Sequence, residues 1–320
     1  MAEMRALSFN APDDVTLVET PTPEPGPGEA LVRIEASAIC GSELHARPGE
    51  NPGHEAAGVV EQAPAGSGFA VGERVGISAV TGCGSCSWCR SGVQLYCTVD
   101  RRMHTAMHAD RVAVPASALR RVPEGTPARD AVLISGDALG VPVRALRRAP
   151  SHAGERVLVL GAGPVGLGHV LVRAHAGAEV VVVEPSAYRR ELALRLGATT
   201  ALEPGEATGA APALAIECTG IPACIQQALA LVEPGGTVLQ SGICRSVEVS
   251  PTATFVAREV TYTGAWYYAD EDYPEIVRLY EQGLPAERLI THDFGAEEIS
   301  AAYRAFVSKD SGKVVLDWTA

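Results

Sequence analysis

The segment Arg156–Glu184 reads RVLVLGAGPVGLGHVLVRAHAGAEVVVVE and decides the fold. Its apolar run Val157–Leu160 predicts a buried strand, and the glycine spacing G-x-G-x-x-G follows at once over residues 161–166. A helical apolar pattern comes next, and the β-branched run Val180–Val183 predicts a second strand that ends on an acid. This order of strand, glycine turn, helix, strand and acid predicts a doubly wound parallel sheet.

The glycine turn has the residues that a dinucleotide pyrophosphate needs. Gly161 permits the tight turn, Gly163 lets backbone approach the phosphates, and Gly166 lets the helix pack on the strand. Pro164 and Val165 open the helix, whose N-terminal N–H groups face the phosphates. With both flanking strands present, the segment predicts dinucleotide binding.

The acid at the end of the second strand bears on which dinucleotide is bound. The Glu184 carboxylate can accept hydrogen bonds from both ribose hydroxyls of an adenosine, and it would repel a 2′-phosphate. We therefore expect NAD. Arg189 and Arg190, on an expected helix Pro185–Leu196, leave NADP open.

Strands continue to alternate with helices after this unit, which predicts a parallel sheet of six strands in an α/β domain. The four further strands are expected at Thr199–Leu202, Ala213–Glu217, Thr237–Gln240 and Glu259–Thr263, with a helix at Ala223–Leu231. The N-terminal part instead predicts strand after strand, at Met4–Phe9, Val15–Glu19 and Ala30–Ser37, and so a β-rich domain. A helix Val141–Arg148 is expected between the two, and the last residues predict helices over 272–282 and 296–308 and a strand Val314–Trp318.

Length and charge limit the class of protein. The 320 residues are enough for two domains, and 47% of them are apolar. The net charge of −12 without a basic block disfavours nucleic acid and anionic membranes as partners. We see no apolar run long enough to span a membrane and no signal-peptide layout at the N-terminus, so we expect a cytoplasmic protein.

Four of the eight cysteines fall within one short lobe: Cys83, Cys86, Cys89 and Cys97. Four thiolates can close a tetrahedral site with no open position, which predicts a structural zinc. An iron–sulfur centre is the alternative that the spacing leaves open. We expect the remaining thiols Cys218, Cys224 and Cys244 to pack as small apolar side chains.

A thiol and an imidazole occur earlier, in Cys40-Gly41-Ser42-Glu43-Leu44-His45 and in Gly53-His54-Glu55. Cys40 and His54 are ligand types that zinc prefers, and nearby carboxylates could orient them. Taken alone, the pair could equally be a buried thiol and a surface histidine.

Together these motifs resemble the zinc-dependent medium-chain dehydrogenase/reductase family, which includes alcohol and polyol dehydrogenases. Glu217-Cys218-Thr219-Gly220 and Gly235-Gly236-Thr237-Val238 add to the likeness, which covers nearly the whole chain. The resemblance implies a GroES-like β-rich catalytic domain, at 1–138 and 267–320, with the zinc lobe at about 82–98. A Rossmann dinucleotide-binding domain at 139–266 would interrupt it. It also implies a homodimer or homotetramer.

The resemblance also assigns roles to single residues. Cys40 and His54 match the first two ligands of a catalytic zinc, the second of two zinc ions per chain. Ser42 matches the hydroxyl that takes the alcohol proton, and His45 the histidine that relays it to solvent. Glu43 matches the carboxylate that orients the ligand histidine.

Further matches are less direct. Glu55 matches an acid beside the metal, and Arg189 a basic residue near the adenosine ribose. The third zinc ligand is expected within residues 133–140, where the family uses Cys, Glu or Asp; this stretch offers only Asp137. The alternative for Asp137 is a helix-capping carboxylate.

Two segments depart from the family pattern. Residues 46–51 are several positions shorter than usual, and the segment 100–109 carries His104 and His108 where relatives often have a glycine pair. We expect these histidines at the surface or lining a pocket, although their spacing of four would also allow metal binding on a helix. Trp266, Tyr267 and Tyr268 are expected either in the wall of the substrate cleft or in the core.

The function expected from the sequence is zinc-dependent hydride transfer between NAD and a secondary alcohol, polyol or cyclitol. A biosynthetic carbonyl or imine reductase that uses NAD(P)H on a larger natural-product intermediate is the first alternative. A non-catalytic NAD-binding protein is a more distant one.

Overall fold

The computed structural model describes residues 3–207 and 211–319. They form two compact units: residues up to Gly140 together with those from Tyr267 onward, and residues Val141–Trp266. The first unit is β-rich and the second alternates strands with helices, which confirms the predicted fold class.

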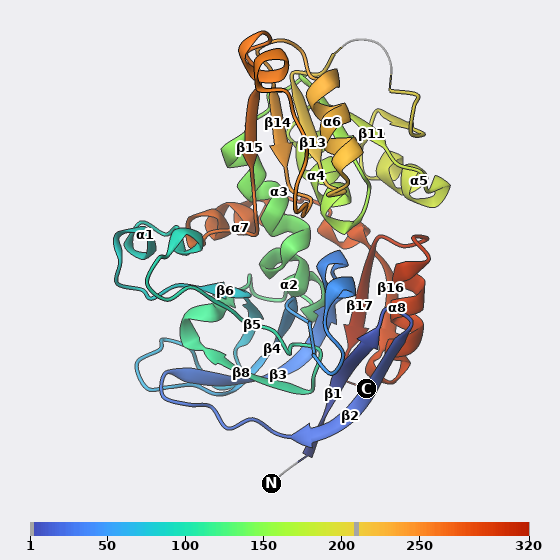
Figure 1. Cartoon of the computed structure of the whole chain (residues 1–320). Helices are drawn as coiled ribbons and strands as arrows, with labels where there is room; N and C mark the ends of the chain where they lie inside the picture. The colour runs from blue at the N-terminus through green and yellow to red at the C-terminus, as the bar shows by residue number, and fades with distance from the viewer. Residues whose placement is uncertain (1–2, 208–210, 320) are drawn as a thin grey trace. The chain divides into compact units, whose positions relative to one another are not determined.

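A seven-stranded sheet dominates the first unit, in the order β16-β17-β3-β4-β5-β9 with β8 also paired to β3 (Figure 1). All of its pairings are antiparallel except β16 with β17. Its strands are β3 (Glu29–Ala38), β4 (Ala56–Gln62), β5 (Arg74–Ile77), β8 (Arg111–Pro115), β9 (Leu119–Arg121), β16 (Ile290–Gly295) and β17 (Lys313–Asp317).

Smaller elements complete this unit. β1 (Glu3–Ala11) and β2 (Asp14–Pro21) form a hairpin, and α8 (Ile299–Val307) packs against β2 and β17 (Figure 1). This unit also contains β6 (Val80–Thr81), β7 (Arg102–Met103), α1 (Ser87–Arg90), α2 (Ala128–Ser135) and α7 (Tyr273–Glu281), together with short 3₁₀ helices. Buried apolar side chains from the hairpin, the sheet and α8 form one core, so the sheet that carries the candidate ligands is closed on that face.

The second unit is built on a six-stranded parallel sheet in the order β12-β11-β10-β13-β14-β15. In chain order this is 3-2-1-4-5-6, a doubly wound arrangement whose direction reverses between β10 and β13. Its strands are β10 (Arg156–Leu160), β11 (Glu179–Val183), β12 (Thr200–Leu202), β13 (Leu214–Glu217), β14 (Thr237–Gln240) and β15 (Thr261–Gly264). Its helices are α4 (Pro164–His175), α5 (Ala187–Arg195) and α6 (Pro222–Leu231). Ligands bind at such a reversal point, where the glycine turn follows β10.

One expected helix begins earlier than predicted. We expected it over Val141–Arg148, but α3 spans Asp137–Arg148 and encloses Pro142. Proline is favoured in the first turn of a helix, but Pro142 lies inside α3. The difference matters because it makes Asp137 the first residue of α3.

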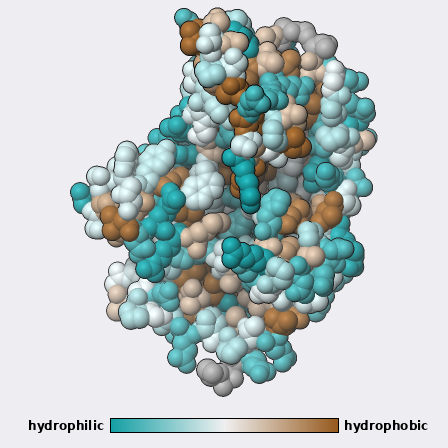
Figure 2. All heavy atoms as spheres, in the orientation of Figure 1, coloured by the Kyte–Doolittle hydropathy of each residue, from teal (hydrophilic) through white to brown (hydrophobic). Residues whose placement is uncertain are grey.

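On the face drawn in Figure 2, hydrophobic residues appear in small groups that hydrophilic residues separate. Within the described ranges, no helix has both the length and the apolar character needed to cross a bilayer.

Candidate functional site

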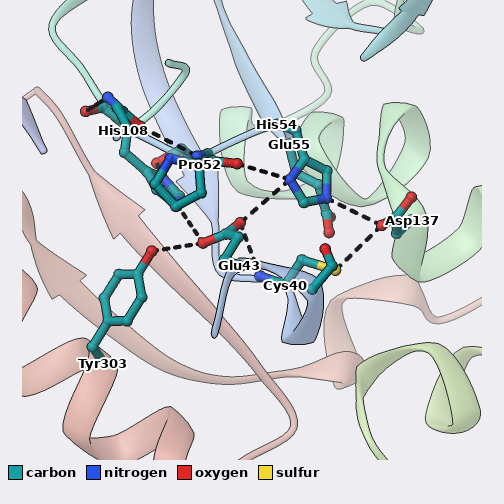
Figure 3. A network of polar contacts seen from close by, with 12 residues as sticks. Cys40, Glu43, Pro52, His54, Glu55, His108, Asp137 and Tyr303 are labelled. Atoms are coloured by element: carbon teal, nitrogen blue, oxygen red, sulfur yellow. Dashed lines mark hydrogen bonds and ion pairs between the residues drawn. The ribbon is translucent and has the colours of Figure 1, made fainter. Parts of the chain in front are cut away.

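Three polar side chains from distant parts of the first unit converge on one point (Figure 3). Cys40 follows β3, His54 lies just before β4, and Asp137 opens α3. Asp137 Oδ2 lies 3.2 Å from Cys40 Sγ and 3.2 Å from His54 Nε2. Ligand atoms of a tetrahedral zinc site with bonds of 2.0–2.3 Å lie roughly 3.3–3.7 Å apart, so these separations suit a zinc ion.

Glu55 lies at the same point and brings an unsatisfied oxygen. Its Oε1 accepts a hydrogen bond from Lys313 Nζ at 2.5 Å. Its Oε2 is buried and has no hydrogen-bond partner among the described residues, and a carboxylate oxygen of Glu55 belongs to the group of potential ligand atoms. Burial raises the pKa of Glu55 to about 7, although Lys313 opposes that effect.

The charges in this group also suit a divalent cation. Burial raises the pKa of the Cys40 thiol, and the Asp137 carboxylate adds to the rise. Burial alone would lower the pKa of His54, but hydrogen bonds to Asp137 and Cys40 outweigh it and hold the pKa well above its usual value. The shift at His54 indicates surroundings that favour positive charge, and a metal ion would displace the protons of both groups.

Two of the expected proton-handling residues lie on η1 (Gly41–His45), the 3₁₀ helix that Cys40 precedes. Ser42 Oγ donates to Cys40 Sγ at 3.4 Å, so its hydroxyl is beside the ligand group. His45 is exposed at the end of η1 and is not part of that group. The structure thus brings Ser42, but not His45, to the candidate ligands.

Glu43 lies behind the ligand histidine, where an orienting carboxylate is expected. Its Oε1 accepts from the backbone N–H of Cys40 at 3.1 Å and lies 3.7 Å from His54 Nδ1. His54 Nδ1 also lies 3.0 Å from the carbonyl oxygen of Pro52. A proton donated from Nδ1 to that carbonyl leaves Nε2 free to bind a metal.

The four-cysteine lobe forms a second cluster. Cys86 Sγ lies 3.5 Å from Cys89 Sγ and 3.9 Å from Cys97 Sγ, and Cys83 Sγ lies 4.0 Å from Cys89 Sγ. A disulfide would require about 2.05 Å, whereas four sulfurs around zinc at 2.3 Å lie about 3.8 Å apart. All eight cysteines are free thiols. The distances therefore suit a closed metal site and not disulfides.

Hydrogen bonds within the lobe favour the thiolates of Cys83 and Cys97, whereas burial raises the pKa of Cys89 to about 12. Cys83 Sγ accepts from the Ser85 hydroxyl and from the backbone N–H of Cys86, which lowers the pKa of Cys83 to about 6. Backbone N–H groups of Cys83 and Asp100 likewise lower the pKa of Cys97. Thiolate is the form that a metal binds.

The glycine turn of the second unit has the expected local geometry. Gly161 has φ +91, and a Cβ on Gly166 would overlap the carbonyl oxygen of Gly161, so neither position accepts a larger residue without strain. A Cβ on Gly163 would meet nothing within 4 Å, which leaves open space at the N-terminus of α4. A pyrophosphate fits such a position.

Glu184 is tied to this turn. Its Oε2 accepts from the backbone N–H of Ala162 at 2.7 Å, and its Oε1 accepts from that of Ser186 at 2.9 Å. Arg190 pairs with Glu203 at 2.7 Å, and Arg189 is buried. The carboxylate is therefore held at the end of β11 beside the glycine turn.

The structure contradicts one prediction and resolves two others. His108 is fully buried, not at the surface or in a pocket wall, and it contacts Glu43. His104 bonds Thr81 at 2.8 Å and joins neither metal group. Tyr267 and Tyr268 are buried, which favours the core, whereas Trp266 is 44% exposed.

Comparisons with known proteins agree with this geometry. Residues 26–124 match the alcohol dehydrogenase GroES-like domain, and residues 164–282 match the zinc-binding dehydrogenase family. The chain is 32% identical to an L-threonine 3-dehydrogenase of Pyrococcus furiosus, over 93% of this chain and 94% of the relative.

Solved structures of dehydrogenases are also similar to this chain over nearly its whole length. An alcohol dehydrogenase of Escherichia coli CFT073, solved with NADH, superposes with a TM-score of 0.89 at 26% identity and covers 99% of this chain and 100% of its own. A thermostable alcohol dehydrogenase of Pyrobaculum aerophilum with bound cobalt and zinc has a TM-score of 0.86 at 27% identity, with 99% and 100% covered.

Proposed function

The chain belongs to the zinc-dependent medium-chain dehydrogenase/reductase family, and from this we propose that it transfers hydride between NAD and a secondary alcohol. The observation that carries the proposal is the position of Asp137 Oδ2, 3.2 Å from both Cys40 Sγ and His54 Nε2. A thiolate, an imidazole and a carboxylate are three ligands that leave the fourth position of a zinc ion for substrate.

The side chains present fit the zinc ions and the NAD that this reaction needs. Cys40, His54 and Asp137 would hold the catalytic zinc, and the cysteine lobe would hold a structural one. The turn at 161–166 and Glu184 would hold NAD. When bound, zinc supplies Lewis acidity toward the alcohol or carbonyl oxygen, and the nicotinamide supplies or accepts the hydride.

The protein's own part is to bind, orient and move a proton. Ser42 takes the alcohol proton at Oγ and releases its own hydroxyl proton in the same step, because its hydroxyl lies beside the ligand sulfur. His45, exposed three positions along η1, accepts the released proton and passes it to solvent. The Pro52 carbonyl keeps His54 oriented for binding through Nε2, and the Glu43 carboxylate, 3.7 Å from Nδ1, adds negative charge behind the ring.

Ser42→Ala is expected to lower turnover by about 100-fold, the usual contribution of a positioned proton acceptor. Zinc content and NAD affinity should stay unchanged, because the side chain binds neither. Steady-state kinetics and a fluorescence titration with NADH measure the two quantities. The exposed Ser117→Ala, in the same unit, is the control and should behave as wild type.

Glu184→Gln is expected to weaken NAD binding by roughly 10- to 100-fold, the loss of one or more hydrogen bonds to a charged group. A glutamine can accept through one oxygen only, so it cannot serve the N–H groups of both Ala162 and Ser186. Glu179→Gln, at the opposite end of β11, is the control. If Ser42→Ala and Glu184→Gln lost NADH affinity equally, the roles given to both residues would be wrong.

A substrate screen tests the reaction itself. NAD or NADP is offered with L-threonine, polyols, cyclitols and simple secondary alcohols, and the corresponding ketones are offered with the reduced cofactors. L-threonine stands first among them because the relatives include L-threonine 3-dehydrogenases. Activity with NAD on any of these alcohols supports the proposal. Activity confined to NADPH and carbonyl or imine substrates would favour a biosynthetic reductase instead.

A further inference from the structure

Glu43 contacts buried side chains on two sides. One side faces Cys40 and His54, and the other faces His108 and Tyr303. On the side away from the ligands, its Oε2 accepts from Tyr303 Oη at 2.6 Å and lies 3.0 Å from His108 Nε2 (Figure 3). All three side chains are buried, with Glu43 2% exposed and the other two 0%. The Tyr303 hydroxyl and the Cys40 N–H both donate to Glu43, and His108 Nε2 can donate as well, which suits a carboxylate acceptor.

The contacts continue beyond His108 to Trp318, the residue that follows β17. His108 Nδ1 lies 2.7 Å from Ser37 Oγ, which accepts a hydrogen bond from Trp318 Nε1 at 2.8 Å. An indole N–H only donates, and a carboxylate only accepts. Every group is satisfied when the Ser37 hydroxyl donates to Nδ1 and His108 donates from Nε2 to Glu43.

His108 also fixes the backbone that carries the ligand histidine. Asn51 Nδ2 donates to the carbonyl oxygen of His108 at 2.8 Å, and Asn51 Oδ1 accepts from the N–H of Gly53 at 3.2 Å. The N–H of Met107 donates to the carbonyl oxygen of Gly53 at 3.0 Å. A Cβ on Gly53 would lie 2.5 Å from the His108 ring, so only glycine lets the two segments approach this closely.

We propose that His108 and Tyr303 are positioning residues of the metal site, which together lock the Glu43 carboxylate and thereby the Cys40 backbone, whose N–H it accepts, and the negative charge that faces His54. The proposal rests on the proposed function, because its ligand is the metal of the Cys40–His54–Asp137 group. Two donors on Oε2 leave Oε1 to face Cys40 N–H and His54. A glutamate side chain has several rotatable bonds, so holding it in one position costs conformational entropy. The hydrogen bonds from Tyr303 and His108 offset that cost.

The test measures metal affinity directly. Metal-free protein is titrated with cobalt(II), whose absorption reports the ligands and their geometry, and zinc affinity is measured against a chromophoric chelator. Tyr303→Phe and His108→Phe are each expected to weaken metal binding at the Cys40–His54–Asp137 group by about 10- to 100-fold, as loss of such supporting hydrogen bonds usually does. The cysteine lobe should keep its affinity.

The choice of variants and two controls separate positioning from folding. Tyr303→Phe removes one hydroxyl and leaves the ring beside Phe9 in place, so it should fold. Tyr280→Phe removes a similar bond, to Asp130 Oδ2 at 2.9 Å, away from the site and should bind both metals as wild type does. His108→Gln keeps an N–H donor and should recover part of the affinity that His108→Phe loses.

The outcomes of these measurements distinguish a failure of the positioning role from a failure of the proposed dehydrogenase function. Wild-type affinity and an unchanged cobalt spectrum in both Phe variants would overturn the positioning role and leave the dehydrogenase proposal intact. A wild-type protein that binds metal only in the cysteine lobe would overturn both.

Discussion

Asp137→Asn is expected to lower NAD-linked turnover by about 10³-fold. The substitution keeps the shape of the side chain but removes the anionic oxygen that lies 3.2 Å from both Cys40 Sγ and His54 Nε2. Metal-ion catalysis contributes several kcal/mol of transition-state stabilisation, and each 1.36 kcal/mol corresponds to a tenfold change in rate. Loss of this ligand should remove most of that contribution.

The NADH affinity of Asp137→Asn should remain at the wild-type value, because the glycine turn and Glu184 lie in the other unit. Asp130→Asn, a carboxylate on α2 that bonds Tyr280, is the matched control and should retain turnover. The measurements are steady-state kinetics and a fluorescence titration. Turnover within tenfold of wild type would show that Asp137 is a helix-start residue and not a ligand.

Cys89→Ser is expected to destabilise the lobe between Cys83 and Cys97 and to remove one zinc per chain. Cys89 Sγ lies near both Cys83 and Cys86, so no complete set of four sulfurs remains without it. The lobe buries few apolar side chains, and Trp88 and Tyr96 are 46% and 40% exposed. Metal binding must therefore supply much of its stability.

The expected effects are a fall in Tm of at least about 5 °C, from a loss of a few kcal/mol in a chain of this size, and new proteolytic cleavage between Cys83 and Cys97. Cys224→Ser is the control, because that thiol packs beside the apolar core of the second unit and belongs to neither metal group. Unchanged zinc content and unchanged cleavage in Cys89→Ser would exclude a structural metal there.

The doubly wound sheet was predictable because its signals are local. Each strand of the second unit lies within a few residues of its expected range, and the glycine turn falls between β10 and α4 as the spacing requires. The prediction missed the start of α3, which begins four residues before Val141 and accommodates Pro142 inside it although proline favours the first turn.

The site was predictable only where short motifs carry it. Cys40 and His54 stand in recognisable segments, whereas the partners of Glu43 do not. His108 and Tyr303 lie 65 and 260 positions away from Glu43 in the chain. Folding alone brings them together, so no local spacing could reveal them. The sequence carried only one weak indication that His108 has a special position: it is a histidine in a segment that departs from the family pattern.

The most direct test of the central claim is zinc per chain, measured by elemental analysis of the wild-type protein and of Asp137→Asn after dialysis against a weak chelator. The account predicts two zinc ions in the wild type and one in the variant, with the remaining ion in the cysteine lobe. One zinc ion in both proteins would contradict this claim, because the Cys40–His54–Asp137 group would then hold no metal. The proposed zinc-dependent mechanism would have to be abandoned.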